Sequence, residues 1–283
     1  MTIAASQEAF LHAFHAEHPA VTSEWLGHGR APDGRSSYEL LRDRVAGRER
    51  VLDLGCGDGL LLDLLAGSDS SEPSAGRERP RQLTGVDLSP QTLALARKRP
   101  ALADTRLEEA RAQELPFPDS SFDACVSHMA LMLMADIEQV AVEVARVLAP
   151  GGVLACVVGN GVLLDEAYDR FRALAKEEIA DTPAAKRMPA LGDRRTRTRE
   201  GFDAILSPAG FAPVEWESVA IDLGGPVDRV WAGVASLYDF EPLDQAAMER
   251  LRGAFLDARR DSITPEGTVP FTVQLRLASA ELR

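Results

Sequence analysis

Short apolar runs alternate with longer amphipathic segments between residues 51 and 159. The runs VLDL, QLTGVD, FDACVS and VLACVVG have the length and the apolar character of buried strands. The segments LLLDLLA, SPQTLALARKR and ADIEQVAVEVARVL lie between them and carry apolar residues at helical spacing. This alternation predicts an α/β fold with a doubly wound, mostly parallel sheet and helices on both faces.

The first part of the chain is predicted to be helical. Phe10, Leu11 and Phe14 recur at helical spacing, and SSYELLRDRV resumes the pattern after a break rich in glycine and proline. Because this segment precedes the regular alternation, we expect residues 1–48 to form a separate N-terminal helical lid.

The rest of the chain, residues 49–283, is expected to form the α/β core. Its alternation breaks at about 162–200 and 223–265, where we expect helical insertions that form a cap near the C-terminus. The polar stretch GSDSSEPSAGRERPR, which starts at Gly67, predicts an exposed loop that follows a helix ending near Ala66.

The overall charge excludes some partners. The chain of 283 residues has a formal net charge of −13, which should repel nucleic acid and anionic membranes. Its three cysteines, Cys56, Cys125 and Cys156, all fall in apolar segments, and an odd number of core thiols suits a reducing compartment. The sequence shows no secretory leader and no apolar run of transmembrane length, so we expect a cytoplasmic protein without a membrane partner.

The stretch VLDLGCGDG places three glycines directly after the first predicted strand. A dinucleotide-binding turn would have the spacing G-x-G-x-x-G, but here Leu60 stands where its third glycine belongs. A tight strand-to-helix turn without a ligand is one interpretation. The alternative is close approach of the backbone to a ligand, with Asp53 and the turn Gly55–Gly59 at its side.

The stretch GVDLSP places Asp87 at the carboxyl end of the second strand, where open α/β sheets bind ligands. A carboxylate there can accept hydrogen bonds from both hydroxyls of a ribose. It could also cap the next helix, but Ser89, followed by Pro90, already provides a helix start. We therefore predict that Asp87 holds a ribose.

Taken together, these motifs resemble those of the class I S-adenosylmethionine-dependent methyltransferases, over about residues 51–159. The matching motifs are D-x-G-x-G-x-G, the acid after the second strand, AQELPFPDSSFDACVS and ARVLAPGGVLACVV. The resemblance implies a Rossmann-like fold and S-adenosylmethionine as the cofactor. It assigns cofactor contacts to Asp53, Gly55, Cys56, Gly57, Gly59, Asp87, Leu88, Ala112, Gln113 and Ser127.

Within that resemblance, Leu88 would pack on the adenine, Ala112 and Gln113 would border it, and the backbone at Ser127 would contact the amino-acid part. The chain departs from the family at Arg111, where an acid is frequent. Arginine cannot accept a hydrogen bond from the adenine amine. Either another group accepts that hydrogen bond, or Arg111 points to solvent.

Candidate catalytic residues are fewer, because the cofactor already carries an electrophilic methyl group. His128 follows the fourth strand and is a candidate general base, or else a histidine that is satisfied by a backbone carbonyl or lines the methionine pocket. Tyr38 could reach the cofactor from the lid. The remaining histidines have no metal-site spacing, so we expect no metal; they are His12, His15, His18 and His28.

The resulting prediction is a methyltransferase that acts on a small-molecule acceptor, as a monomer or homodimer. Two alternatives stay open: an enzyme that cyclises S-adenosylmethionine and releases methylthioadenosine, and a cofactor-binding module without catalysis. A basic island at Arg194, Arg195, Arg197 and Arg199 is either a solvated loop or a contact for an anionic acceptor.

Overall fold

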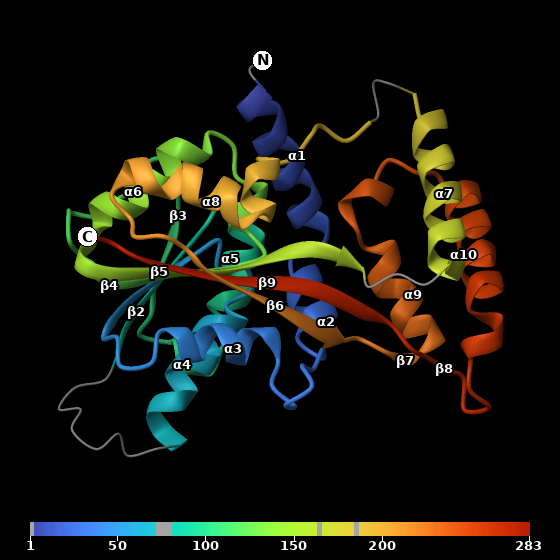
Figure 1. Cartoon of the computed structure of the whole chain (residues 1–283), viewed down its shortest axis with the longest axis horizontal. Helices are drawn as coiled ribbons and strands as arrows, with labels where there is room; N and C mark the ends of the chain where they lie inside the picture. Colours follow the sequence, from blue (N-terminus) through green and yellow to red (C-terminus); the bar gives the residue numbers. More distant parts are fainter. Residues whose placement is uncertain (1–2, 72–80, 163–165, 184–186) are drawn as a thin grey trace.

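The computed structural model describes residues 3–71, 81–162, 166–183 and 187–283 (Figure 1). Its main sheet has the strand order β3-β2-β1-β4-β5-β9-β6. Strands β1 to β5 run parallel, and β9 is antiparallel to both β5 and β6. The strands are β1 (Arg50–Leu54), β2 (Gln82–Asp87), β3 (Arg106–Glu109), β4 (Phe122–His128), β5 (Leu148–Val162), β6 (Glu215–Asp222) and β9 (Thr272–Glu281). The predicted doubly wound, mostly parallel sheet is confirmed.

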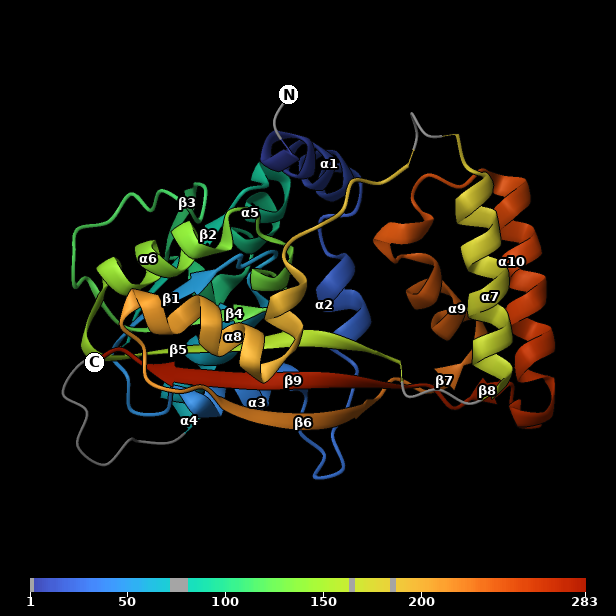
Figure 2. The same cartoon turned by 45° about the horizontal axis from the view of Figure 1, so that its top comes forward.

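Helices cover both faces of this sheet (Figures 1 and 2). Adjacent residues of β1 point to opposite faces, so Val51 joins one hydrophobic core and Leu52 the other, each with 0% exposure. The first core packs under α3 (Ser37–Arg44), α4 (Leu60–Ser71) and α5 (Pro90–Ala96), and the second under α6 (Ile137–Val147) and α8 (Arg199–Leu206). Because both faces of the central strands are buried, their sequences are nearly continuous apolar runs.

Local signals set several helix ends. The Ser89 side chain accepts from the Thr92 amide with Pro90 in the first turn, so the predicted start of α5 is confirmed. The predicted end of α4 near Ala66 was wrong, since this helix continues to Ser71. A glycine inside a helix costs only about 1 kcal/mol relative to alanine, and Leu61 and its buried neighbours anchor the preceding turns. The rest of the predicted loop, residues 72–80, lies outside the described residues.

The remaining helices gather at the carboxyl ends of the parallel strands. Figures 1 and 2 show α1 and α2 beside that edge, and α7, α9 and α10 as a group beyond the end of β5. Phe171 of α7 packs edge-on against Phe255 of α10, with ring centroids 5.8 Å apart. The bounds are α1 (Ile3–Glu17), α2 (Val21–Leu26), α7 (Glu166–Asp181), α9 (Val227–Ala235) and α10 (Gln245–Arg259).

Short elements complete the chain. A small antiparallel sheet pairs β7 (Gly225–Pro226) with β8 (Thr268–Val269). The 3₁₀ turns are η1 (Pro100–Leu102), η2 (Leu131–Leu133), η4 (Arg194–Arg197), η5 (Ser207–Ala209), η6 (Tyr238–Phe240) and η7 (Arg260–Ser262). Within the described ranges, no helix has both the length and the apolar character needed to cross a membrane. Cys56, Cys125 and Cys156 are buried and free, as their apolar surroundings in the sequence predicted.

Candidate active site

The glycine turn between β1 and α4 has three residues in the left-handed region. The φ angles of Gly55, Gly57 and Gly59 are +75°, +55° and +80°. A Cβ on Gly55 would collide with the side chain of Ala130, and one on Gly59 would lie 2.7 Å from a methyl of Leu102. A Cβ on Gly57 would have no atom within 4 Å. Two of the glycines are therefore required by packing, whereas Gly57 faces open space.

Asp53, at the carboxyl end of β1, is a buried acid that forms no ion pair with any residue that the structure describes. It is 1% exposed, and neither carboxylate oxygen has a hydrogen-bond partner among the described residues. Burial raises the pKa of Asp53 well above its usual value, and the nearby charges of Asp87 and Asp58 raise it further. A cationic group bound beside Asp53 would relieve this cost.

Asp87, at the end of β2, is held by the backbone around it. One carboxylate oxygen accepts from the Gly57 amide at 2.8 Å, and the other accepts from the Ser89 amide at 2.8 Å. Each oxygen retains a lone pair, so the side chain can still accept from two further donors. These two bonds fix its orientation between the glycine turn and α5.

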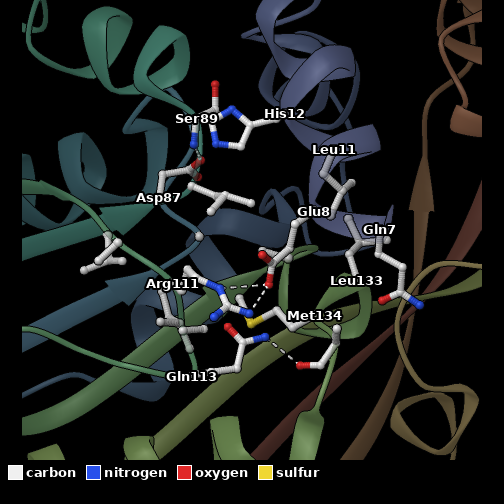
Figure 3. Close-up of a pocket in the computed structure, with 18 of the residues that line it drawn as sticks. Gln7, Glu8, Leu11, His12, Asp87, Ser89, Arg111, Gln113, Leu133 and Met134 are labelled. Carbon is white, nitrogen blue, oxygen red and sulfur yellow. Dashed lines mark hydrogen bonds and ion pairs between the residues drawn. The ribbon is translucent and has the colours of Figure 1, made fainter. Parts of the chain in front are cut away.

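Two adjoining cavities lie above these strand ends. They have about 730 and 580 Å³ of empty space and share five lining residues: His15, Gly55, Asp87, Ala130 and Leu133. We call them the first and the second cavity. The first, drawn in Figure 3, is bounded by the ends of β2 and β3, by η2 and by one side of α1. The second lies over the glycine turn and reaches α2 and η6.

The structure brings most of the predicted site residues to these cavities. The first is lined by Gly55, Asp87, Leu88, Ala112 and Gln113, and the second by Tyr38, Asp53, Gly55, Cys56, Gly57, Asp87 and His128. Gly59 and Ser127 line neither cavity. The Ser127 hydroxyl instead donates to the Leu54 carbonyl at 2.8 Å and accepts from the Leu131 amide, so it ties β4 to β1.

Arg111 does not point freely to solvent. Its Nε and Nη2 donate to Oε1 of Glu8 in α1, at 3.0 and 2.6 Å (Figure 3). This bond raises the pKa of the Arg111 guanidinium, although its side chain is 45% exposed. Gln113 donates through its amide to the Ala135 carbonyl at 2.7 Å. Arg111 stands where the family often has an acid, and in this chain Glu8 of α1 places an acid in the same cavity.

His128 lines the second cavity. Its Nε2 shares a hydrogen bond with the Ser37 hydroxyl at 2.9 Å, and its ring stacks on Tyr38 at 3.7 Å between centroids. Burial lowers the pKa of His128 to about 3, so the ring is neutral at physiological pH. The contacts of His128 with Ser37 and Tyr38 connect β4 to α3. A role for His128 as a general base stays a prediction.

Sequence reasoning missed a contact between the N-terminal helix α1 and the turn η6. His15 of α1 and Tyr238 of η6 share a hydrogen bond, with Nε2 and the phenolic oxygen 3.0 Å apart. Both line the second cavity, and His15 also lines the first. The residues are 223 positions apart, so no local pattern in the sequence could pair them.

The basic island lies away from both cavities. Arg195 donates to Asp193 and Glu138, and Arg199 lies 4.0 Å from Asp203. Arg194 and Arg197 are exposed, and neither lines a cavity. These contacts favour the interpretation that the island is solvated, although its residues form η4 and the start of α8 and not a loop.

Comparisons with known proteins agree with this geometry. A family model described as a methyltransferase domain matches residues 52–156, from β1 to β5. Trans-aconitate 2-methyltransferase of Methylobacterium nodulans is 30% identical over 233 residues, which cover 80% of this chain and 83% of that protein. The 27-O-demethylrifamycin SV methyltransferase of Amycolatopsis mediterranei is 32% identical over 249 residues, covering 82% of this chain and 80% of that protein.

A solved structure extends the comparison to the fold. Phosphoethanolamine N-methyltransferase 2 of Haemonchus contortus, in complex with S-adenosyl-L-methionine, superposes with a TM-score of 0.56 at 19% identity. The match covers 98% of this chain and 60% of that one. At this identity the likeness concerns the fold.

Proposed function

Because this chain belongs to the class I S-adenosylmethionine-dependent methyltransferases, we propose that it methylates an oxygen atom of a small biosynthetic intermediate. Its cofactor is S-adenosylmethionine, and its acceptor is a small molecule, as in the relatives that it matches over most of their length. One of those relatives is named for a 27-O-demethyl substrate, which supports oxygen as the methylated atom.

The observation that carries the cofactor assignment in this chain is the unpaired Asp53. A buried carboxylate that lines a cavity and has no donor among the described residues fits the ammonium of an amino acid. Gly57 leaves the adjacent space free of side-chain atoms. We propose that this part of the second cavity holds the methionine end of the cofactor.

The adenosine end would occupy the first cavity. Asp87 is fixed at the junction of the two cavities and can accept from two ribose hydroxyls. Leu88 supplies an apolar wall, and the chain at Ala112 and Gln113 borders the far side. When bound, the cofactor supplies a methyl group attached to a positively charged sulfur. The protein has to orient an acceptor toward that methyl and exclude water.

The N-terminal helices are proposed to act as a lid. Glu8 and His15 place side chains of α1 over both cavities, and Glu8 is held by Arg111 on the core. A lid of this kind would have to open for the cofactor to enter and would exclude water when closed.

A panel of matched acceptors tests the oxygen assignment. The protein is incubated with methyl-labelled S-adenosylmethionine and, in parallel, with trans-aconitate and sets of a carboxylic acid, a hydroxyl compound and an amine that share one carbon skeleton. We expect label on oxygen acceptors. Treatment with mild alkali distinguishes methylated carboxylic acids from methylated hydroxyl compounds, because methyl esters release their label as methanol whereas methyl ethers keep it. Label confined to the amines would contradict the proposal.

A further inference from the structure

We propose that His15 is the general base of the reaction, positioned by Tyr238, and that the acceptor is consequently a hydroxyl compound and not a carboxylate. This inference rests on the function proposed above. A carboxylate is already ionised near neutral pH and needs no base, whereas an alcohol or phenol must lose a proton as it is methylated.

The first observation is the position of His15. It is one of five residues shared by the two cavities, and Asp87, Gly55, Ala130 and Leu133 are the others. If the adenosine and methionine ends of the cofactor occupy the two cavities, the group that joins them lies at this junction. His15 therefore borders the place where methyl transfer would occur.

The second observation concerns the two ring nitrogens. Nε2 is engaged by the Tyr238 hydroxyl, whereas the buried Nδ1 has no hydrogen-bond partner among the residues that the structure describes. The Phe14 ring packs against Tyr238 with centroids 4.4 Å apart, which restrains the phenol. In the tautomer with hydrogen on Nε2, that nitrogen donates to the phenolic oxygen and leaves Nδ1 free to accept a proton.

The charges around His15 suit a base that works near neutral pH. Burial lowers the pKa of His15, and the Asp87 carboxylate from the end of β2 opposes that shift. The His18 backbone also raises the pKa of His15, whereas the charges of His18, just beyond the end of α1, and of His12 on α1 lower it. Tyr238, facing from η6, has a raised pKa because it is buried and close to Asp87, so it stays neutral. The ring is thus neutral before reaction, and Asp87 stabilises it once protonated.

His128 is less suited to this role. Like His15, it shares Nε2 with a hydroxyl, that of Ser37, and has a buried Nδ1 without a hydrogen-bond partner among the described residues. The difference is that no carboxylate is among the influences on the pKa of His128, which burial lowers to about 3. Protonating that buried ring during catalysis would create a charge without a counterion. His15 has Asp87 in the same cavities for this purpose.

The proposed step moves a methyl group from sulfur to oxygen and a proton from that oxygen to His15. The acceptor oxygen forms a bond to the methyl carbon while the bond from that carbon to sulfur breaks and its electron pair stays on sulfur. The hydroxyl proton moves to Nδ1 of His15. The products are a methyl ether, a neutral thioether in S-adenosylhomocysteine and an imidazolium, which returns its proton to water when the products leave.

Two variants and one control test this inference. His15→Gln keeps a polar side chain that cannot titrate, Tyr238→Phe removes only the hydroxyl, and His28→Gln changes an exposed histidine outside both cavities. With a hydroxyl acceptor from the panel, we expect kcat of His15→Gln to fall about 10²- to 10⁴-fold. We expect kcat of Tyr238→Phe to fall about tenfold and kcat of His28→Gln to equal that of the wild type.

Two readouts separate catalysis from structure. Calorimetric affinity for S-adenosylhomocysteine should stay within about threefold in His15→Gln, and the acid limb of its kcat–pH profile should disappear. Histidine NMR titration of the unliganded wild type should show His15 protonating below pH 6.5, and Tyr238→Phe should move that titration.

Each contrary result has its own meaning. If His15→Gln keeps its kcat and its acid limb, or loses affinity for S-adenosylhomocysteine in step with activity, His15 is not the base. If the panel labels carboxylates alone, the hydroxyl assignment is wrong while oxygen methylation stands. If the panel labels amines alone, the proposed function itself fails.

Discussion

Asp53→Asn is expected to stabilise the unliganded protein and to weaken its binding of S-adenosylhomocysteine. In the unliganded protein the Asp53 carboxyl group is buried without a donor among the described residues, so its ionised form is costly. Asparagine keeps the shape and removes the charge, so the free energy of unfolding should rise by about 1–3 kcal/mol. The bound amino group would lose a charged acceptor, so affinity should fall about 10- to 100-fold.

The stability gain should depend on pH in a defined direction. The pKa of Asp53 is raised in the folded state, so the folded protein holds this proton at pH values where the unfolded chain has released it. Wild type and Asp53→Asn should therefore respond alike at pH values below the unfolded-chain pKa, near 4. As the pH rises toward the folded-state pKa, the wild type should lose stability relative to the variant.

Thermal unfolding over a pH series, with calorimetry at neutral pH, measures both effects. Asp104→Asn is the matched control, because it removes one charge from an exposed position. It should change neither the pH dependence nor the affinity. An Asp53→Asn protein with unchanged affinity would refute the assignment of Asp53 to the amino group.

Gly57→Val is expected to abolish measurable binding of S-adenosylhomocysteine, with a loss of more than about 100-fold. The backbone has a φ of +55° here, and an added side chain would enter space that is empty of protein atoms. Valine would therefore occupy the second cavity without displacing protein. The backbone strain should cost about 1–2 kcal/mol of stability.

Gly47→Val separates the strain from the loss of space. Gly47 has a φ of +86°, also has no atom within 4 Å of an added Cβ, and lines neither cavity. Both variants should lose similar stability in thermal unfolding, and only Gly57→Val should lose binding in calorimetry. Normal binding by a folded Gly57→Val protein would mean that the glycine turn serves packing alone.

The glycine turn and the strand ends were predictable because their signals are local. A strand, a run of glycines and a helix lie within about 20 residues, so VLDLGCGDG places Asp53 and Gly57 at the carboxyl end of a strand, as the structure shows. The sequence could not show that Gly55 and Gly59 are required because a side chain there would collide with Ala130 and Leu102. These two residues are distant from the glycine turn in the chain.

The contacts made by α1 were not predictable, for the same reason. Glu8 meets Arg111 across 103 positions, and His15 meets Tyr238 across 223. Helical periodicity identified α1 but gave no indication of which strand ends it would cover. The early end predicted for α4 has the opposite cause: glycine and serine weakened a local pattern that burial of the preceding leucines overrides.

The fate of the methyl group tests the central claim most directly. The protein is incubated with S-adenosylmethionine, with and without an acceptor from the panel, and the sulfur-containing products are measured by mass spectrometry. We predict S-adenosylhomocysteine in equal amount to methylated acceptor, and intact S-adenosylmethionine when no acceptor is present. Protein-dependent release of methylthioadenosine from S-adenosylmethionine alone would contradict methyl transfer and establish cyclisation of the cofactor.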